Sequence, residues 1–139
     1  MSDTKRPAPV ETALTAGFWE GVRAGRLVIQ RCLECGLLRH YPQPMCPACR
    51  QLGFDWAPVS GRGVIHSYTV AHRAFHAAWQ EHVPYAIATI ELDEGVRMVC
   101  DLIETPLERV VIGARVEVFF AELPGQGRMP RFRVVEGER

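Results

Sequence analysis

Residues 32–49, which read CLECGLLRHYPQPMCPAC, contain the pattern that decides the fold of this chain. Two Cys-x-x-Cys pairs, Cys32 with Cys35 and Cys46 with Cys49, are separated by ten residues. Pairs at this spacing can bring four thiolates around one tetrahedral metal ion. Because four cysteines fill every coordination position, the pattern predicts a structural Zn²⁺ site with no open position for water or substrate. Iron in a rubredoxin-like electron carrier is the alternative use of the same pattern.

The composition of the chain is typical of a small globular protein. Its 139 residues and 15.6 kDa correspond to one ordinary domain or two very small ones. No window approaches the roughly 18 consecutive apolar residues that cross a bilayer, and residues 1–7 are too polar for a secretory signal. We therefore expect a cytoplasmic protein that does not contact a membrane. In that reducing compartment, five cysteines indicate metal binding rather than disulfides.

The segment before the cysteines predicts one amphipathic helix. Residues 1–11 contain two prolines and mixed charge, so we expect a flexible lead. Apolar residues recur every four or five positions over residues 11–26, which is close to helical spacing, and residues 27–31 then favour a short strand. Phe18 and Trp19 are adjacent, so a single helix face cannot bury both against one surface. We therefore expect one of them to be available to a partner.

After Trp56 the sequence changes to repeated β-strand signals. Five runs rich in β-branched and aromatic residues follow one another, and the turn Asp93-Glu94-Gly95 predicts a hairpin between the second run and the third. The runs cover residues 64–70, 85–92, 96–103, 115–120 and 131–135. Five short strands with a glycine-rich start indicate a small barrel of the oligonucleotide/oligosaccharide-binding (OB) type, and a small β-sandwich is the alternative.

These patterns predict a mainly β chain in three parts. We expect an N-terminal lead and helix over residues 1–27, a zinc ribbon over residues 28–57 and a five-stranded OB-fold domain over residues 58–139. Residues 1–50 carry seven basic and four acidic side chains, whereas residues 51–139 carry nine basic and twelve acidic ones. Because nucleic-acid-binding barrels usually present a basic groove, the acidic barrel argues against a nucleic-acid partner.

The insert between the first two of the five strands, residues 71–84, is a candidate contact surface. Its aromatic and basic side chains are His72, Arg73, Phe75, His76 and Trp79. Aromatic and arginine side chains in surface loops are enriched at interfaces and ligand sites. Two alternatives remain open at this stage. Phe75 and Trp79 could fill the barrel mouth, and His72 and His76 could lie one helical turn apart, as metal ligands or simply as exposed side chains.

No complete catalytic constellation is recognisable in the sequence. The three serines lie outside any nucleophile motif, and no glycine-rich phosphate loop is present. Cys100 falls on the same strand face as Val96, Met98 and Leu102, so we expect a core thiol rather than a nucleophile.

The order of these features resembles a known family. The motifs that carry the resemblance are Phe18-Trp19-Glu20-Gly21, Arg31-Cys32-x-x-Cys35-Gly36, Tyr41-Pro42, Cys46-Pro47-x-Cys49, Ser60-Gly61-x-Gly63, Tyr68-Thr69, Val83-Pro84-Tyr85 and Gly95-Val96-Arg97. From about residue 14 to 135, the chain is similar to proteins with a zinc ribbon and an OB fold, long catalogued as a domain of unknown function and associated with acyl-CoA metabolism. The resemblance implies an N-terminal helix, a rubredoxin-like ribbon and a C-terminal OB barrel.

The resemblance also implies a function. Such proteins assemble with thiolase-superfamily enzymes or form a domain beside an acyl-CoA hydratase, and the catalytic residues belong to the partner. We therefore expect a non-catalytic accessory subunit that binds a thiolase-like or acyl-CoA hydratase-like partner and completes its acyl-CoA site, for carbon–carbon bond chemistry or acyl transfer on CoA thioesters. The expected contacts to acyl-CoA or to the partner are His72, Arg73, Phe75, His76, Trp79, Phe18 and Trp19. A nucleic-acid-binding module and a stand-alone acyl-CoA-binding protein are the alternatives.

Overall fold

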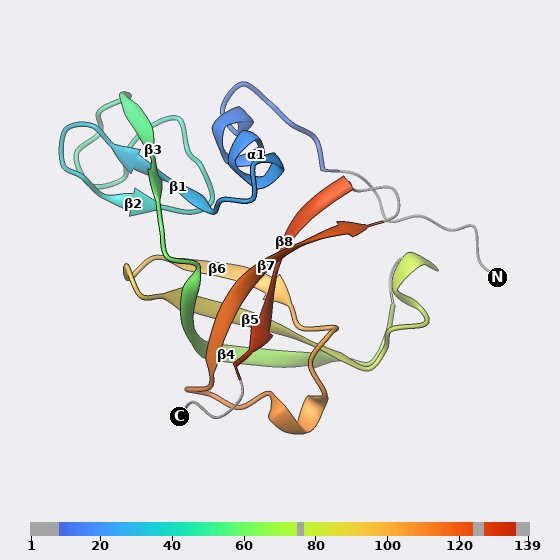
Figure 1. Ribbon diagram of the computed structural model, residues 1–139. Helices are drawn as coiled ribbons and strands as arrows, with labels where there is room; N and C mark the ends of the chain where they lie inside the picture. The colour runs from blue at the N-terminus through green and yellow to red at the C-terminus, as the bar shows by residue number, and fades with distance from the viewer. Residues whose placement is uncertain (1–8, 75–76, 124–126, 136–139) are drawn as a thin grey trace.

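Two antiparallel sheets and one α-helix make up the part of the chain that the computed structural model describes, residues 9–74, 77–123 and 127–135 (Figure 1). The first sheet has the strand order β2-β1-β3, and the second has the order β6-β5-β4-β7-β8. The elements of the ribbon region are α1 (Ala16–Arg23), β1 (Val28–Cys32), β2 (Leu38–Arg39) and β3 (Phe54–Pro58). The second sheet contains β4 (Arg62–Ala71), β5 (Tyr85–Leu92), β6 (Arg97–Asp101), β7 (Arg115–Leu123) and β8 (Gly127–Val134). Two short 3₁₀ turns, η1 (Ala77–Trp79) and η2 (Leu107–Arg109), lie in connections.

The central strands of the barrel form because their side chains alternate between the core and the outer face. In β5 every second residue is buried, from Ala86 to Leu92. This alternation fits a strand with one face against the core and explains why the sequence predicted β5 over its full length. The Asp93-Glu94-Gly95 turn then connects β5 to β6 as expected, with Gly95 at φ +92°.

The helix and the ribbon share one hydrophobic core with the barrel. Phe18 and Val22 of α1 and Ile29 of β1 belong to the same buried cluster as Ile65 of β4 and Phe132 of β8. The described elements are therefore packed as one unit, although the sequence predicts three parts.

The expectation of a mainly β chain with an N-terminal helix and a five-stranded C-terminal sheet is confirmed. The predicted helix over residues 11–26 was too long, since α1 covers only Ala16–Arg23. Thr12 and Thr15 exchange hydrogen bonds between their hydroxyls and backbone groups at 3.0–3.4 Å, which stabilises a turn in place of the first helical turn. Most of the predicted flexible lead, residues 1–8, lies outside the described residues.

Several strands differ in length from the prediction, because pairing rather than local composition sets their ends. β2 and β3 lack a strand signal in the sequence and form by pairing with the two edges of β1. β7 and β8 pair continuously from Val116 opposite Val134 to Leu123 opposite Gly127, so both extend into the predicted loop. Pro130, which cannot donate a hydrogen bond, is tolerated because β8 is an edge strand. Within the described ranges, no helix is long and apolar enough to cross a membrane.

A close approach between α1 and β3 depends on Gly17. A Cβ atom on Gly17 would overlap the indole ring of Trp56. Alanine in place of glycine normally stabilises a helix by about 1 kcal/mol, whereas overpacking typically costs about 1–3 kcal/mol. We expect Gly17→Ala to lower the free energy of unfolding, measured by denaturant titration. In a Trp56→Ala background the same change should be neutral or stabilising, and a stabilising effect in the parent would contradict this packing.

Candidate functional site: a metal centre and an adjoining groove

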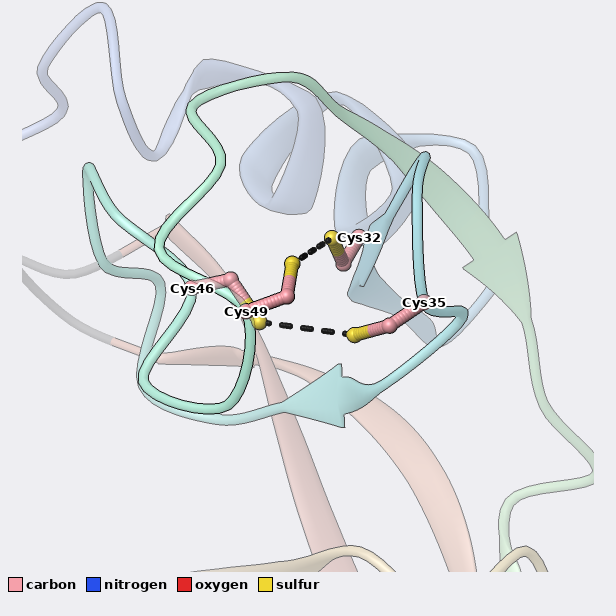
Figure 2. A group of neighbouring side chains, drawn as sticks. All are labelled: Cys32, Cys35, Cys46 and Cys49. Carbon is pink, nitrogen blue, oxygen red and sulfur yellow. Dashed lines mark hydrogen bonds between the residues drawn. The ribbon is translucent and has the colours of Figure 1, made fainter.

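The four predicted metal ligands converge at one end of the ribbon. The sulfur atoms of Cys32, Cys35, Cys46 and Cys49 all lie within 4.8 Å of one another. Figure 2 shows them in two facing pairs, with 3.5 Å between the sulfurs of Cys32 and Cys49 and 3.6 Å between those of Cys35 and Cys46. Sulfur atoms bound to one tetrahedral Zn²⁺ at about 2.3 Å are about 3.8 Å apart. The spacing of the four free thiols is therefore close to that around a bound zinc ion.

The two Cys-x-x-Cys segments have the same backbone shape. The N–H of Gly36 donates to the carbonyl of Cys32 at 3.0 Å, and the N–H of Arg50 donates to the carbonyl of Cys46 at 2.9 Å. Gly36 has φ +77°, and Arg50 adopts φ +66° at the equivalent position. This left-handed conformation is rare for a residue with a side chain, so the sequence indicates the first turn more clearly than the second.

Backbone N–H groups within each segment favour the thiolate form that a metal requires. The pKa of Cys32 is lowered to about 6, because N–H groups of Cys35 and Glu34 donate hydrogen bonds to its sulfur. The pKa of Cys46 is also lowered, chiefly by the N–H of Cys49. Hydrogen bonds to the charged form of a group stabilise that form, so Cys32 and Cys46 ionise more readily than a free thiol. Burial, followed by the neighbouring thiols, raises the pKa of Cys35 and raises that of Cys49 to about 12, so these two ionise less readily.

An apolar groove of about 280 Å³ lies between the ribbon and the barrel. Its lining includes side chains of α1, of the turn after β2, and of the two edge strands β6 and β8. We call it the ribbon–barrel groove and define it by Phe18, Trp19, His40, Tyr41, Val99 and Cys100. No sequence signal indicated this groove, because its walls come together from four separate segments.

The two adjacent aromatic residues of α1 both line the groove but differ in burial. Phe18 is 6% exposed and belongs to the core, whereas Trp19 is half-buried. The two rings meet edge to face with 5.0 Å between their centroids. Tyr41 and Val99 lie at the same groove and are 59% and 49% exposed. That Trp19 is available to a partner stays a prediction.

The polar groups of the groove do not form a catalytic constellation. Burial lowers the pKa of His40 to about 4. Burial, followed by the negative charge of Asp101, raises the pKa of Cys100 to about 12, and its thiol donates to the Asp101 carbonyl at 3.2 Å. The Asp101 carboxylate is paired with the buried Arg131 at 2.6 Å. A neutral imidazole and a protonated thiol therefore leave the groove without an activated nucleophile near neutral pH.

The predicted contact residues of the insert lie apart from this groove. His72 and Arg73 are exposed in the segment after β4, and Trp79 is half-buried in η1, whereas Phe75 and His76 lie outside the described residues. β4 extends to Ala71 and residues 72–74 are not helical, whereas His76, the other member of the i, i+4 pair, lies outside the described residues, so the helical spacing of the two histidines stays a prediction. In Figure 1 the insert and α1 are well separated, so the structure does not bring the two groups of predicted contacts together.

Two family profiles match adjacent parts of the chain. The profile described as the ChsH2 rubredoxin-like zinc ribbon domain matches residues 19–55, and that of the ChsH2 C-terminal OB-fold domain matches residues 56–121. A DUF35 domain-containing scaffold protein of Methanocaldococcus jannaschii is 34% identical over 73% of this chain and 72% of its own. The chain belongs to the DUF35 family. The predicted resemblance, the zinc ribbon and the OB fold are therefore confirmed.

Two further matches name enzymes that contain chains similar to this one. A probable enoyl-CoA hydratase alpha subunit of Thermomonospora curvata is 38% identical over 92% of this chain, which spans only 40% of that subunit. A solved structure titled Ltp2-ChsH2(DUF35) aldolase contains a chain that is 36% identical, with a TM-score of 0.80 over 91% of this chain and 98% of the other. These names are consistent with an accessory subunit of an acyl-CoA enzyme.

We expect substitutions of the four clustered cysteines and of Cys100 to differ in their effect on zinc content and stability. We expect Cys46→Ser to lose bound zinc and to unfold the ribbon, because residues 32–50 contain few apolar side chains that could hold it together. Cys100→Ser is the matched control and should keep the parent's metal content, measured by elemental analysis alongside thermal unfolding. Equal zinc content and melting temperature in Cys46→Ser and the parent would rule out a structural metal.

The buried imidazole predicts a specific pH dependence. Because the pKa of His40 falls from 6.5 in the unfolded chain to about 4 in the folded one, acid protonates the unfolded state first. The parent should therefore lose roughly 3 kcal/mol of stability through His40 as the pH falls from about 6.5 to 4, with no contribution above this window. In denaturant titrations, His40→Phe should remove this loss, whereas Tyr41→Phe should keep it. The same slope in His40→Phe and the parent would contradict the assignment.

Proposed function

We propose that this protein is a non-catalytic accessory subunit that binds a thiolase-like or acyl-CoA hydratase-like enzyme and completes its acyl-CoA site. Family membership carries the proposal, because relatives are named as hydratase alpha subunits, as scaffold proteins and as part of an aldolase complex. The reaction is carbon–carbon bond chemistry or acyl transfer on a CoA thioester, and its catalytic residues belong to the partner.

The chemistry of the described residues supports a structural rather than a catalytic role. Four cysteines fill the coordination sphere of the proposed Zn²⁺, so the metal has no position left for substrate. Cys100, the thiol outside this centre, is kept protonated by burial. Arg131, the buried cation beside the groove, is neutralised by Asp101. None of these three groups is therefore in a state suited to catalysis.

We assign the main partner contact to the ribbon–barrel groove, with Trp19 as its anchor. Trp19, Tyr41 and Val99 expose apolar surface beside one cavity, and interface cores are enriched in such aromatic side chains. The occupant is an apolar protrusion of the partner enzyme, since the relatives are subunits and the groove is too apolar for a phosphate-bearing nucleotide. His72, Arg73, Phe75, His76 and Trp79 form a second proposed contact, to the partner or to acyl-CoA.

The proposal is tested by isolating the protein from its source with nuclease treatment and identifying what co-purifies by mass spectrometry. We expect a near-stoichiometric thiolase-like or hydratase-like enzyme whose activity or stability depends on this subunit. Recovery of the protein alone, or a partner fully active and stable without it, would overturn the proposal. Saturable binding of a CoA thioester by the isolated protein would then favour the stand-alone alternative.

The two proposed contact surfaces, the groove and the insert, can be tested separately with variants of Trp19 and Trp79. Because buried tryptophans often contribute 2 kcal/mol or more to an interface, Trp19→Ala should weaken binding to the identified partner by about tenfold or more. Trp79→Ala probes the insert in the same binding titration, and both variants should keep the parent's zinc content. Unchanged affinity of Trp19→Ala would remove the groove from the interface.

A further inference from the structure

Two arginines are buried among the described residues, and they differ in their surroundings. Arg131 is 4% exposed, and its guanidinium contacts Asp101 at 2.6 Å and Glu104 at 3.4 Å. Arg39 is 6% exposed, and its Nη2 donates to the carbonyl of Gln43 at 3.1 Å, whereas its Nε and Nη1 have no hydrogen-bond partner. A buried charge is costly unless an opposite charge and hydrogen bonds replace its hydration. Among the described residues no carboxylate forms an ion pair with Arg39, so its charge lacks a carboxylate partner there.

The strand register places Arg39 on the same face of the ribbon as a metal ligand. Arg39 of β2 lies directly opposite Gln30 of β1, and Cys32 follows Gln30 by two residues on the same strand. Opposite residues, and alternate residues of one strand, share a face of the sheet. Diagonal neighbours such as Arg39 and Cys32 have Cα atoms roughly 7–8 Å apart, a distance that an arginine side chain can span.

The second cysteine pair reaches this face through the loop that follows β2. The side-chain amide of Gln30 donates to the carbonyl of Gln43 at 3.0 Å and accepts its N–H at 2.8 Å, so this loop lies over the face that holds Gln30 and Arg39. Cys46 follows Gln43 by three residues and is fully buried. Both cysteine pairs therefore adjoin the face on which Arg39 is buried.

We propose that Arg39 is the counter-cation of the metal–thiolate centre, a positioning residue that increases the affinity of the ribbon for Zn²⁺. The inference rests on the proposed metal site. Four thiolates and one Zn²⁺ carry a net charge of −2, and a buried cation stabilises such a centre more than an exposed one does. The carboxylates of the ribbon are otherwise occupied or remote from the interior, since Asp55 is held by Arg31 at 2.8–2.9 Å and Glu34 is exposed.

Zinc affinity of the full chain, measured by competition with a chelator, tests the role of the charge. Loss of a residue that supports metal ligands typically costs 10–100-fold in affinity, so we expect Arg39→Gln to bind Zn²⁺ about tenfold more weakly or worse. Arg39→Lys keeps the charge and should stay close to the parent. Arg31→Gln is the matched control, because it removes an exposed arginine next to Cys32 and should leave the affinity unchanged. Parent-like binding by Arg39→Gln, or an equal loss in Arg39→Lys, would overturn the inference.

A second readout separates charge from a purely structural role. With iron in place of zinc, one electron from an electrode converts Fe³⁺ to Fe²⁺ and changes the charge of the centre from −1 to −2. A neighbouring cation favours the reduced state, so the reduction potential should be lower in Arg39→Gln than in the parent and in Arg31→Gln. Equal potentials in Arg39→Gln and the parent would count against the counter-cation.

A measurement on the parent protein keeps the test independent of whether a variant folds. With Co²⁺ in place of Zn²⁺, the paramagnetic ion should shift or broaden the NMR signal of the Arg39 Nε–H more strongly than that of Arg31. An unaffected Arg39 signal in a chain that binds one metal ion through four thiolates would overturn only the counter-cation. A parent chain that binds no metal would overturn the metal site itself.

Discussion

Convergence of four thiols on one point is the constraint on which the rest of the structure depends. The segment that carries them is rich in cysteine, proline and glycine and contributes little to the core by itself. Holding Cys32 and Cys35 against Cys46 and Cys49 fixes both ends of the loop that follows β2. It also fixes β1, whose Ile29 enters the shared core beside the barrel residue Phe132. The ribbon is thus anchored by the proposed metal at one end and by apolar contacts at the other.

The packing of the helix and ribbon on the barrel creates the second feature of interest, the ribbon–barrel groove. α1 lies against β1 and β8, and the turn after β2 brings His40 and Tyr41 beside the edge strand β6. None of these segments indicates a groove in its own sequence. Together they surround an apolar cavity next to the two unpaired edges of the five-stranded sheet. An accessory subunit would gain from this arrangement, because a rigid rim of aromatic and aliphatic side chains needs little ordering when a partner binds.

Electrostatics distinguishes the two halves of the molecule. On the barrel side, the buried Arg131 is neutralised by carboxylates that are adjacent in the fold. On the ribbon side, no carboxylate of the described residues pairs with Arg39, and the metal–thiolate centre is our proposed source of negative charge. Both arrangements follow the rule that a buried cation needs a nearby anion, supplied in one case by side chains and in the other by a coordinated ion.

The sequence by itself determined the elements whose signal is local. The Cys-x-x-Cys spacing predicted the four converging thiols, the alternation of β5 predicted that strand to the residue, and Asp93-Glu94-Gly95 predicted the hairpin turn. Tertiary structure decided what depends on contacts between distant segments. β2 and β3 exist because β1 offers two edges, and Arg50 takes a left-handed conformation because the second cysteine pair must match the first. Phe18 is buried more deeply than Trp19 because the barrel covers only one face of α1. Hydrogen-bond pairing, metal geometry and burial are long-range constraints, and no window of the sequence contains them.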